Sequence, residues 1–292
     1  MRNFRLLILP LFVILLNSCN DDEKIEPLNN QNFIKSFAVT VNEGNNSIIG
    51  YIDEDTSTIL IEYSDEMDLK NLKTEIIVSE NATIIPNSGE LIDLSKGTLT
   101  FTVTSENGSK QEYKVAGYTK NLLKNPKGNN MAESWVLNGD VGVDETNNEF
   151  YIVKYENPAR TDITQLVKFN RDYSDKYILF IGDLTTEKTV EGSITRHPYF
   201  WGHQNGPFNF DENLYEEIIQ GMIHLEKANV WEVVSRANPL LKGVEAVIFK
   251  MGQASQVGDS LDGTKCKFRD IEVRIFESIK DSEIYVSNLY RK

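Results

Sequence analysis

The sequence predicts an all-β protein made of two successive β-sandwiches. Residues 33–118 consist largely of short segments in which apolar and polar residues alternate, a pattern typical of half-buried antiparallel strands. Turn-forming residues separate these segments at short intervals. A second series of strand-like segments follows from about residue 120, and a chain of 292 residues is long enough for one or two domains.

The strands expected in the first half carry their apolar residues on one face. In "TLTFTVT", Leu99, Phe101 and Val103 alternate with threonines, so one face of the strand is apolar. Asn107-Gly108 follows this segment and is a hairpin turn signal, because both residues tolerate positive φ. Similar alternation occurs in "SFAVTV", "STILIEY" and "QEYKVAG", and "IIPNSGE" is a second turn signal. Strands at this spacing, without a convincing helix, predict a β-sandwich over residues 33–119.

Several framework residues of this half match a known module. They are Ser36-Phe37, Gly50-Tyr51-Ile52-Asp53, Ala82 with Ile85-Pro86 and Ser88-Gly89, Phe101 and Val103 with Glu106-Asn107-Gly108-Ser109, and Tyr113 with Val115. With this pattern the segment resembles the immunoglobulin-like modules near the N-termini of Bacteroidetes surface lipoproteins. It contains no His, Cys or Trp. The resemblance therefore implies a spacer that lifts the second domain off the membrane; a protein-binding module is the alternative.

The second half, residues 120–279, is predicted to form a jelly roll. It opens with "NLLKNPKG" at 121–128 and closes with "FRDIEV" at 268–273. Between these ends lie "TQLV" at 164–167, "YILF" at 177–180 and "WEVV" at 231–234. This order resembles the galactose-binding-like jelly roll, which many bacterial carbohydrate-binding modules share with the sugar-recognising domain of some F-box proteins. Other relatives bind protein or lipid or only support an enzyme, so the resemblance implies the fold more than the ligand.

One segment of the second half fits a strand poorly. In "DENLYEEIIQGMIHLEKA", Leu214, Ile218 and Met222 recur at helical spacing, and Asp211 is a suitable helix cap. Gly221 interrupts the pattern. We expect a short helical turn followed by a strand that leads to Trp231. Residues 280–292 are expected to be a C-terminal extension.

The first residues form a secretory leader. Arg2 and Arg5 precede an apolar run that is about half the ~20 residues needed to span a bilayer, which indicates a signal peptide over residues 1–18. Leu16-Asn17-Ser18-Cys19 resembles the lipobox of bacterial lipoproteins, although Asn17 departs from the usual small or branched residue. The resemblance implies lipidation of Cys19 and a membrane contact through lipid alone. A plain secretory signal with a chance cysteine is the alternative.

The segment at 19–32 is expected to be a flexible tether. The cluster Asn20-Asp21-Asp22-Glu23-Lys24 resembles the export signal that sends Bacteroidetes lipoproteins to the cell surface. An ordinary solvated linker is the alternative, since blocks of charge are usually solvated. The predicted location is the outer membrane, lipid-anchored and exposed at the cell surface. We also expect an exposed linker between the sandwiches near residues 118–120.

The stretch "RHPYFWGHQNGPFNF" at 196–210 is the strongest candidate for a ligand site. Two of the three histidines and one of the three tryptophans lie in it. In a middle strand of a jelly roll, His197, Tyr199, Trp201 and His203 share one face, and Phe200 points into the core. An aromatic ring can stack on the apolar face of a pyranose, and its polar edge can bind hydroxyls. Gln204 and Asn205 can extend that polar edge.

Other interpretations of the same stretch remain open. If the faces are reversed, Trp201 belongs to the core, where large aromatic residues are often buried. A transition-metal site is the weakest alternative, because His197 and His203 are roughly 20 Å apart along a strand.

A structural calcium ion at Asp270 fits the jelly-roll resemblance, but Lys127 and Asn129 stand where an acidic residue is usual. No other cofactor is expected.

Three further features limit the function. The loop "GQASQVGDSLDG" at 252–263 can add Gln253, Gln256, Asp259 and Asp262 to a binding rim, or it is simply solvated. With Cys19 lipidated, Cys266 is the only remaining thiol, so no internal disulfide is expected, and its context predicts a half-buried strand in which Cys is a small hydrophobe. The net charge of −14 argues against nucleic acid as a partner.

No pattern of catalytic residues stands out. The sequence has no G-x-S-x-G nucleophile turn and no phosphate-binding glycine loop. Among 44 acidic residues some pair will fit the spacing of a glycosidase by chance. The sequence therefore predicts a surface lipoprotein that binds a glycan without catalysis. The alternative is a structural or adhesive lipoprotein whose jelly roll binds a partner protein.

Overall fold

The protein is almost entirely β-structure. The computed structural model describes residues 27–41, 47–130, 134–153, 161–188, 199–205, 216–222, 225, 227–253 and 263–290. The strands of the first half are β1 Ile34–Val41, β2 Ser47–Ile49, β3 Tyr51–Asp53, β4 Thr58–Tyr63, β5 Leu72–Val78, β6 Thr83–Ile85, β7 Leu91–Ile92, β8 Leu99–Thr104 and β9 Lys110–Thr119, with the 3₁₀ turn η1 at Leu94–Lys96.

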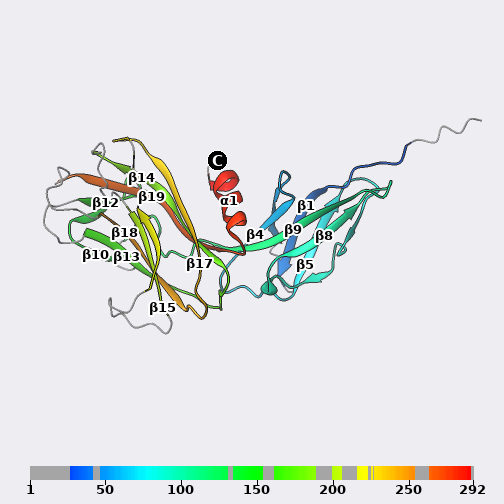
Figure 1. The fold of residues 1–292 in the computed structure, drawn as a ribbon, viewed down its shortest axis with the longest axis horizontal. Helices are drawn as coiled ribbons and strands as arrows, with labels where there is room; N and C mark the ends of the chain where they lie inside the picture. Colours follow the sequence, from blue (N-terminus) through cyan, green and yellow to red (C-terminus); the bar gives the residue numbers. More distant parts are fainter. Residues whose placement is uncertain are drawn as a thin grey trace, which may run out of the picture.

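The second half contains ten strands among the described residues, followed by a helix. The strands are β10 Val136–Asn138, β11 Val141–Asp144, β12 Glu149–Val153, β13 Thr161–Lys168, β14 Tyr177–Thr186, β15 Tyr199–Asn205, β16 Glu216–Met222, β17 Glu232–Pro239, β18 Ala246–Gln253 and β19 Lys265–Phe276. The helix α1 Ile279–Ile284 continues into the π-helix η4 Tyr285–Tyr290. Figure 1 shows the two halves as separate lobes, with α1 above the junction between them.

The first sandwich packs two sheets around one apolar core. One sheet has the order β2-β1-β5-β7, and the other contains β3, β4, β9, β8 and β6. The apolar faces that the alternating pattern predicts lie inward: Phe37 and Phe101 are fully buried, and their rings meet edge to face with centroids 5.2 Å apart. The predicted hairpin also forms, with residues 105–109 between the paired Thr104 and Lys110. Of Asn107 and Gly108 only Gly108 adopts a positive φ, +87°, and its N–H donates to the Ser105 carbonyl at 2.9 Å.

The second sandwich encloses a larger core. Its five-stranded sheet has the order β10-β13-β18-β15-β16, and the opposite layer contains β11, β12, β19, β14 and β17. Asn121 joins the two ends of this half, since its side-chain N–H₂ donates to the Ile271 carbonyl and its Oδ1 accepts from the Val273 N–H, both at 3.0 Å. The opening and closing motifs of the sequence therefore lie side by side. We call the face of the five-stranded sheet that points away from the core its outer face.

The two sandwiches share a continuous sheet and a third apolar cluster. Strands β9 and β19 meet where Tyr118 pairs with Phe276, and these two rings stack with centroids 5.2 Å apart. Helix α1 and η4 cover the junction with Ile284 and Tyr285, which pack into the same cluster. The expectation of an exposed linker is wrong: Tyr118 and Thr119 belong to β9 and are buried, because the strand continues across the boundary.

The structure confirms the all-β fold class. Within the segment expected as a C-terminal extension, residues 280–290 belong to α1 and η4. Cys266 is buried in β19, as predicted. In the ambiguous segment, residues 216–222 form strand β16, which includes Ile218 and Met222 of the helical pattern, and Asp211 and Leu214 lie outside the described residues. Within the ranges that the structure describes, no helix is long and apolar enough to cross a bilayer.

Candidate ligand-binding surface

The aromatic stretch contributes an interior strand of the five-stranded sheet. Strand β15 pairs with β18 on one side and with β16 on the other, both antiparallel. This confirms the predicted middle strand for residues 199–203, and Gln204 and Asn205 complete it. His197 lies outside the described residues.

Phe200 fixes how β15 faces the core. Its side chain is only 1% exposed and lies against Phe249 and Phe268, with ring centroids 5.5 and 6.0 Å away. Across the core, Gly182 of β14 leaves room for this ring, since a Cβ there would lie 2.9 Å from Phe200 Cζ. The prediction that Phe200 points into the core is therefore confirmed.

The positions of β15 on either side of Phe200 pair with β18 residues that alternate with the buried ones. Trp201 pairs with Lys250 and His203 with Ile248, whereas the buried Phe200 pairs with the buried Met251. The register with β16 shifts between Gly202 and His203. The side chains of Tyr199, Trp201, His203, Gln204 and Asn205 are not among the described parts, so their role stays a prediction.

Lys250 makes a charged contact on the outer face. Its ammonium lies 3.5 Å from Asp162 Oδ2 of β13, and both side chains are largely buried. Thr164 accompanies Asp162 by donating its hydroxyl hydrogen to Asp162 Oδ1 at 3.2 Å. On the outer face next to β15, Lys250 and Asp162 thus form a largely buried ion pair, and the apolar Ile248 pairs with His203.

The other predicted site residues lie elsewhere. Asp270 is in β19 with a side chain 68% exposed, and its nearest charged partner is Arg269 Nε at 3.9 Å. Among the described residues, no group of three or more His, Cys, Asp or Glu is arranged to hold a metal ion. A calcium ion at Asp270 remains a prediction. In the 252–263 loop, Gln253 ends β18, and Gln256, Asp259 and Asp262 lie outside the described residues.

A hollow of about 840 Å³ with a mixed polar and apolar lining lies between the two sandwiches, and sequence reasoning missed it. The first sandwich contributes the loop 65–70 and the second contributes Asn170 to Tyr173. A second hollow of about 680 Å³ adjoins it and shares Asn170, Arg171 and Asp172. We call the two hollows together the junction groove. No sequence pattern could reveal it, because its two sides are about 100 residues apart in the chain.

Asp65 holds the two sides of the junction groove together. Its Oδ2 accepts the Asn170 N–H at 2.8 Å, and its Oδ1 accepts the hydroxyl hydrogen of Tyr173. Arg171 donates to the Asp65 carbonyl at 3.1 Å from Nε and to the Met67 carbonyl. Burial, followed by the charge of Glu277, raises the pKa of the nearby Tyr63 hydroxyl further above its ordinary value.

The opposite side of the junction is also held by charged groups. Arg274 Nη1 contacts Glu62 at 2.5 Å and the Thr119 carbonyl at 2.9 Å, and its Nε contacts Glu272 at 2.6 Å. Burial lowers the pKa of Arg274, but the hydrogen bond and charge of Glu272 raise it overall. The guanidinium therefore stays charged between the two sandwiches.

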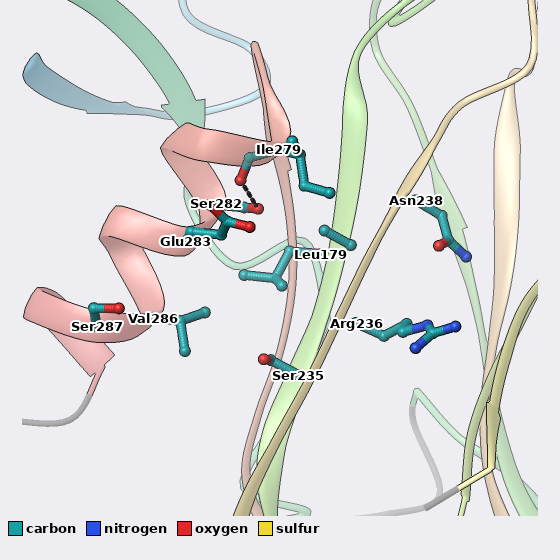
Figure 2. A pocket seen from close by; sticks show the side chains of 10 residues that line it. Leu179, Ser235, Arg236, Asn238, Ile279, Ser282, Glu283, Val286 and Ser287 are labelled. Atoms are coloured by element: carbon teal, nitrogen blue, oxygen red, sulfur yellow. Dashed lines mark hydrogen bonds between the residues drawn. The ribbon is translucent and has the colours of Figure 1, made fainter.

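A smaller hollow of about 430 Å³ lies beneath the C-terminal helix. Figure 2 shows Leu179 and Val286 in the space between the helix and strand β14, with Arg236 and Asn238 farther from the helix. Ser282 uses its hydroxyl within the helix, donating to the Ile279 carbonyl at 2.6 Å. This hollow presents fewer charged groups than the junction groove.

Residues 34–116 match a family model described as SGBP, N-terminal. The match covers less than half of the chain and concerns the first sandwich only. No curated protein matches the sequence.

Several solved structures resemble the chain weakly. A proposed glycoside hydrolase from Bacteroides thetaiotaomicron is 13% identical over 85% of this chain and 97% of its own, with a TM-score of 0.33. The CBM22-1 xylan-binding domain from Paenibacillus barcinonensis is 10% identical over 55% of this chain and 96% of its own, with a TM-score of 0.34. A CBM4 structure is 14% identical over 51% and 83%, also with a TM-score of 0.34. Likeness at this level says nothing about ligand or activity.

Proposed function

We propose that the protein is a cell-surface glycan-binding protein whose second sandwich holds carbohydrate without catalysis. The observation that carries this proposal is the burial of Phe200 in the interior strand β15. Because successive positions of a strand alternate between faces, a buried Phe200 assigns positions 199, 201 and 203 to the outer face. The family match of the first sandwich supports a glycan-binding role at a bacterial surface.

The proposed site uses the residues that suit a sugar. Trp201 and Tyr199 would stack on the apolar face of pyranose rings, and His203 or His197 would bind hydroxyls at the edge. By the same alternation Asn205 would add a donor and an acceptor, whereas position 204, which pairs with the buried Val247, falls on the core face. Lys250, which pairs with Trp201, is held in an ion pair with Asp162. No step of bond cleavage is assigned to any of these residues.

The test compares two tryptophans in the soluble mature chain. Affinity electrophoresis with starch, xylan, mixed-linkage β-glucan, galactomannan and polygalacturonate identifies the polysaccharide that is retained. Trp201→Ala should weaken that binding by ~1–3 kcal/mol. This is the loss seen when an aromatic residue that stacks on a base of single-stranded nucleic acid is replaced by alanine. Trp231→Ala is the matched control, because Trp231 lies outside the five-stranded sheet and contacts Arg269 instead. Calorimetric titration and thermal unfolding separate binding from folding.

One combined result would contradict the proposal. If Trp201 belongs to the core, its truncation should lower the free energy of unfolding by ~3–5 kcal/mol. A large loss of stability, together with no binding by the parent protein to any polysaccharide, would favour a partner protein as the ligand.

The location is proposed from the leader. We expect Cys19 to carry the lipid and the acidic tether at 19–32 to place the protein at the cell surface. Cys19→Ala should release the protein from the membrane fraction, because lipid chains contribute ~0.8 kcal/mol per buried CH₂. Retention of a processed Cys19→Ala protein in the membrane pellet would exclude the lipid anchor.

A further inference from the structure

The outer face of the five-stranded sheet leads directly into the junction groove. Asn205, the last residue of β15, pairs with Ala246, the first residue of β18, and Ala246 lines the groove. Trp201 pairs with Lys250, four residues farther along β18, which is a path of about 13 Å at the rise of a strand. Leu166 and Lys168 of β13 also line the groove, and they pair with Ile248 and Ala246 on the same outer face.

We propose that one extended, uncharged polysaccharide chain runs from the β15 surface into the junction groove, where the first sandwich also binds it. This inference rests on the proposed function and deepens it, because it names the ligand as a long chain rather than a terminal sugar. It also replaces the expected spacer role of the first sandwich with a share in binding.

The rim of the groove offers the chemistry that hydroxyl groups need. Lys70 and Asp68 from the first sandwich and Lys168, Asn170 and Asp172 from the second are exposed and line it. Ammonium and amide groups donate hydrogen bonds, and carboxylate and amide oxygens accept them. Each hollow falls within the roughly 300–1,000 Å³ of known ligand sites. The groove can therefore hold sugar rings without any change in the core.

The charge of the groove favours a neutral chain. More carboxylates than cations line the two hollows, and the whole chain carries a net charge of −14. A polyanion such as polygalacturonate would be repelled at long range. An uncharged polysaccharide has only hydroxyls and ring oxygens to satisfy.

The contacts of Asp65 keep the groove open in one shape. Asp65 of the first sandwich is held by Asn170 and Tyr173 of the second, and Arg274 ties the opposite side to Glu62. A binding surface shared by two units that are already fixed requires no ordering when the ligand arrives. The two sandwiches can therefore act as one surface.

The experiment uses a double variant and a control with the same charge. Lys70→Ala/Lys168→Ala removes one rim ammonium from each sandwich, and Lys73→Ala/Lys280→Ala removes two exposed ammoniums outside the groove. Binding of the polysaccharide retained in the panel, and of its enzymatic fragments of increasing length, is measured by calorimetry. The rim variant should bind the full polysaccharide about tenfold more weakly, as expected for two lost hydrogen bonds, and should bind the shortest active fragments like the parent.

The outcomes separate this inference from the proposed function. For the parent and the control, affinity should keep rising as the fragments become longer. For the rim variant, affinity should level off at a shorter fragment length. Equal binding of the full polysaccharide by the rim variant and the control overturns the inference and leaves the proposed function intact. Failure of the parent to bind any polysaccharide contradicts both. Unchanged thermal unfolding of the rim variant shows that the effect arises from binding.

Discussion

Two groups of polar side chains meet at the junction of the sandwiches, and they differ in what they contact. Asp65 and Arg274 are buried, and each binds partners in the other sandwich. Lys70, Lys168 and Asp172 are exposed on the groove, and the bonds of Asp172 are local, to Ser174. A buried charge must be paired, whereas an exposed one is satisfied by water. The first group is therefore explained by folding, and the second is available to a ligand.

The strongest test of the first group removes the charge of Arg274 and keeps its length. Arg274→Met leaves Glu62 and Glu272 at the junction without their shared partner, so the free energy of unfolding should fall by about 3 kcal/mol. Urea unfolding followed by circular dichroism measures this loss. Arg236→Met is the matched control, because Arg236 is exposed in β17 and should change stability by no more than about 0.5 kcal/mol.

Equal stability of the Arg274→Met and Arg236→Met variants would contradict the distinction between buried and exposed charged groups. It would mean that the Arg274 contacts with Glu62, Glu272 and Thr119 add little beyond the apolar packing of Tyr118 and Tyr285 around them.

Local signals in the sequence identified the strands but not this junction. Alternation predicted the strands β8 and β9, because neighbouring residues decide which face of a strand is apolar, and Asn107-Gly108 predicted the hairpin between them. The same logic placed Phe200 in the core. By contrast, Arg274 and Glu62 are 212 residues apart, and Asp65 and Tyr173 are 108 apart, so no short pattern connects them.

One missed element did have a sequence signal. Ser278 caps α1, because its hydroxyl accepts the Asp281 N–H at 3.2 Å and donates to the Asp281 carboxylate at 2.6 Å. A serine followed three residues later by an acidic residue is close to the capping box that begins many helices. The exposed linker was mispredicted for a different reason: β9 continues into the second sandwich and is covered there by Tyr285.

A smaller effect is expected where one hydrogen bond of the first group is removed. Tyr173→Phe deletes the hydroxyl that donates to Asp65 and keeps the ring that packs against Phe169. A hydrogen bond to a charged group contributes about 1.5 kcal/mol, so the free energy of unfolding should fall by roughly that amount. Tyr177→Phe, at a half-buried tyrosine in β14, is the control. A loss no larger than that of the control would mean that the Tyr173–Asp65 hydrogen bond adds no stability, as for the exposed side chains.

The smallest expected effect concerns Glu277, which lies between the two groups. It is largely buried beside the junction groove and pairs with Lys176. Burial raises the pKa of Glu277 above its ordinary value of 4.5, although the hydrogen bond and charge of Lys176 lower it. The folded protein therefore holds this proton more tightly than the unfolded chain. As pH rises from about 4.5 through the folded pKa, the contribution of Glu277 to the free energy of unfolding falls.

Glu277→Gln fixes the neutral form and should remove that loss. At pH 7 the variant should be as stable as the parent or more stable by up to about 0.5 kcal/mol, and its stability should depend less on pH above about 4.5. Asp281, whose pKa burial also raises, keeps part of the slope in both proteins. Urea unfolding across the pH series measures the difference, with the exposed Glu283→Gln as control. A loss above about 1 kcal/mol at pH 7 would show that pairing with Lys176 outweighs burial. Glu277 would then belong with the buried, paired charges, although its partner Lys176 lies in the same sandwich.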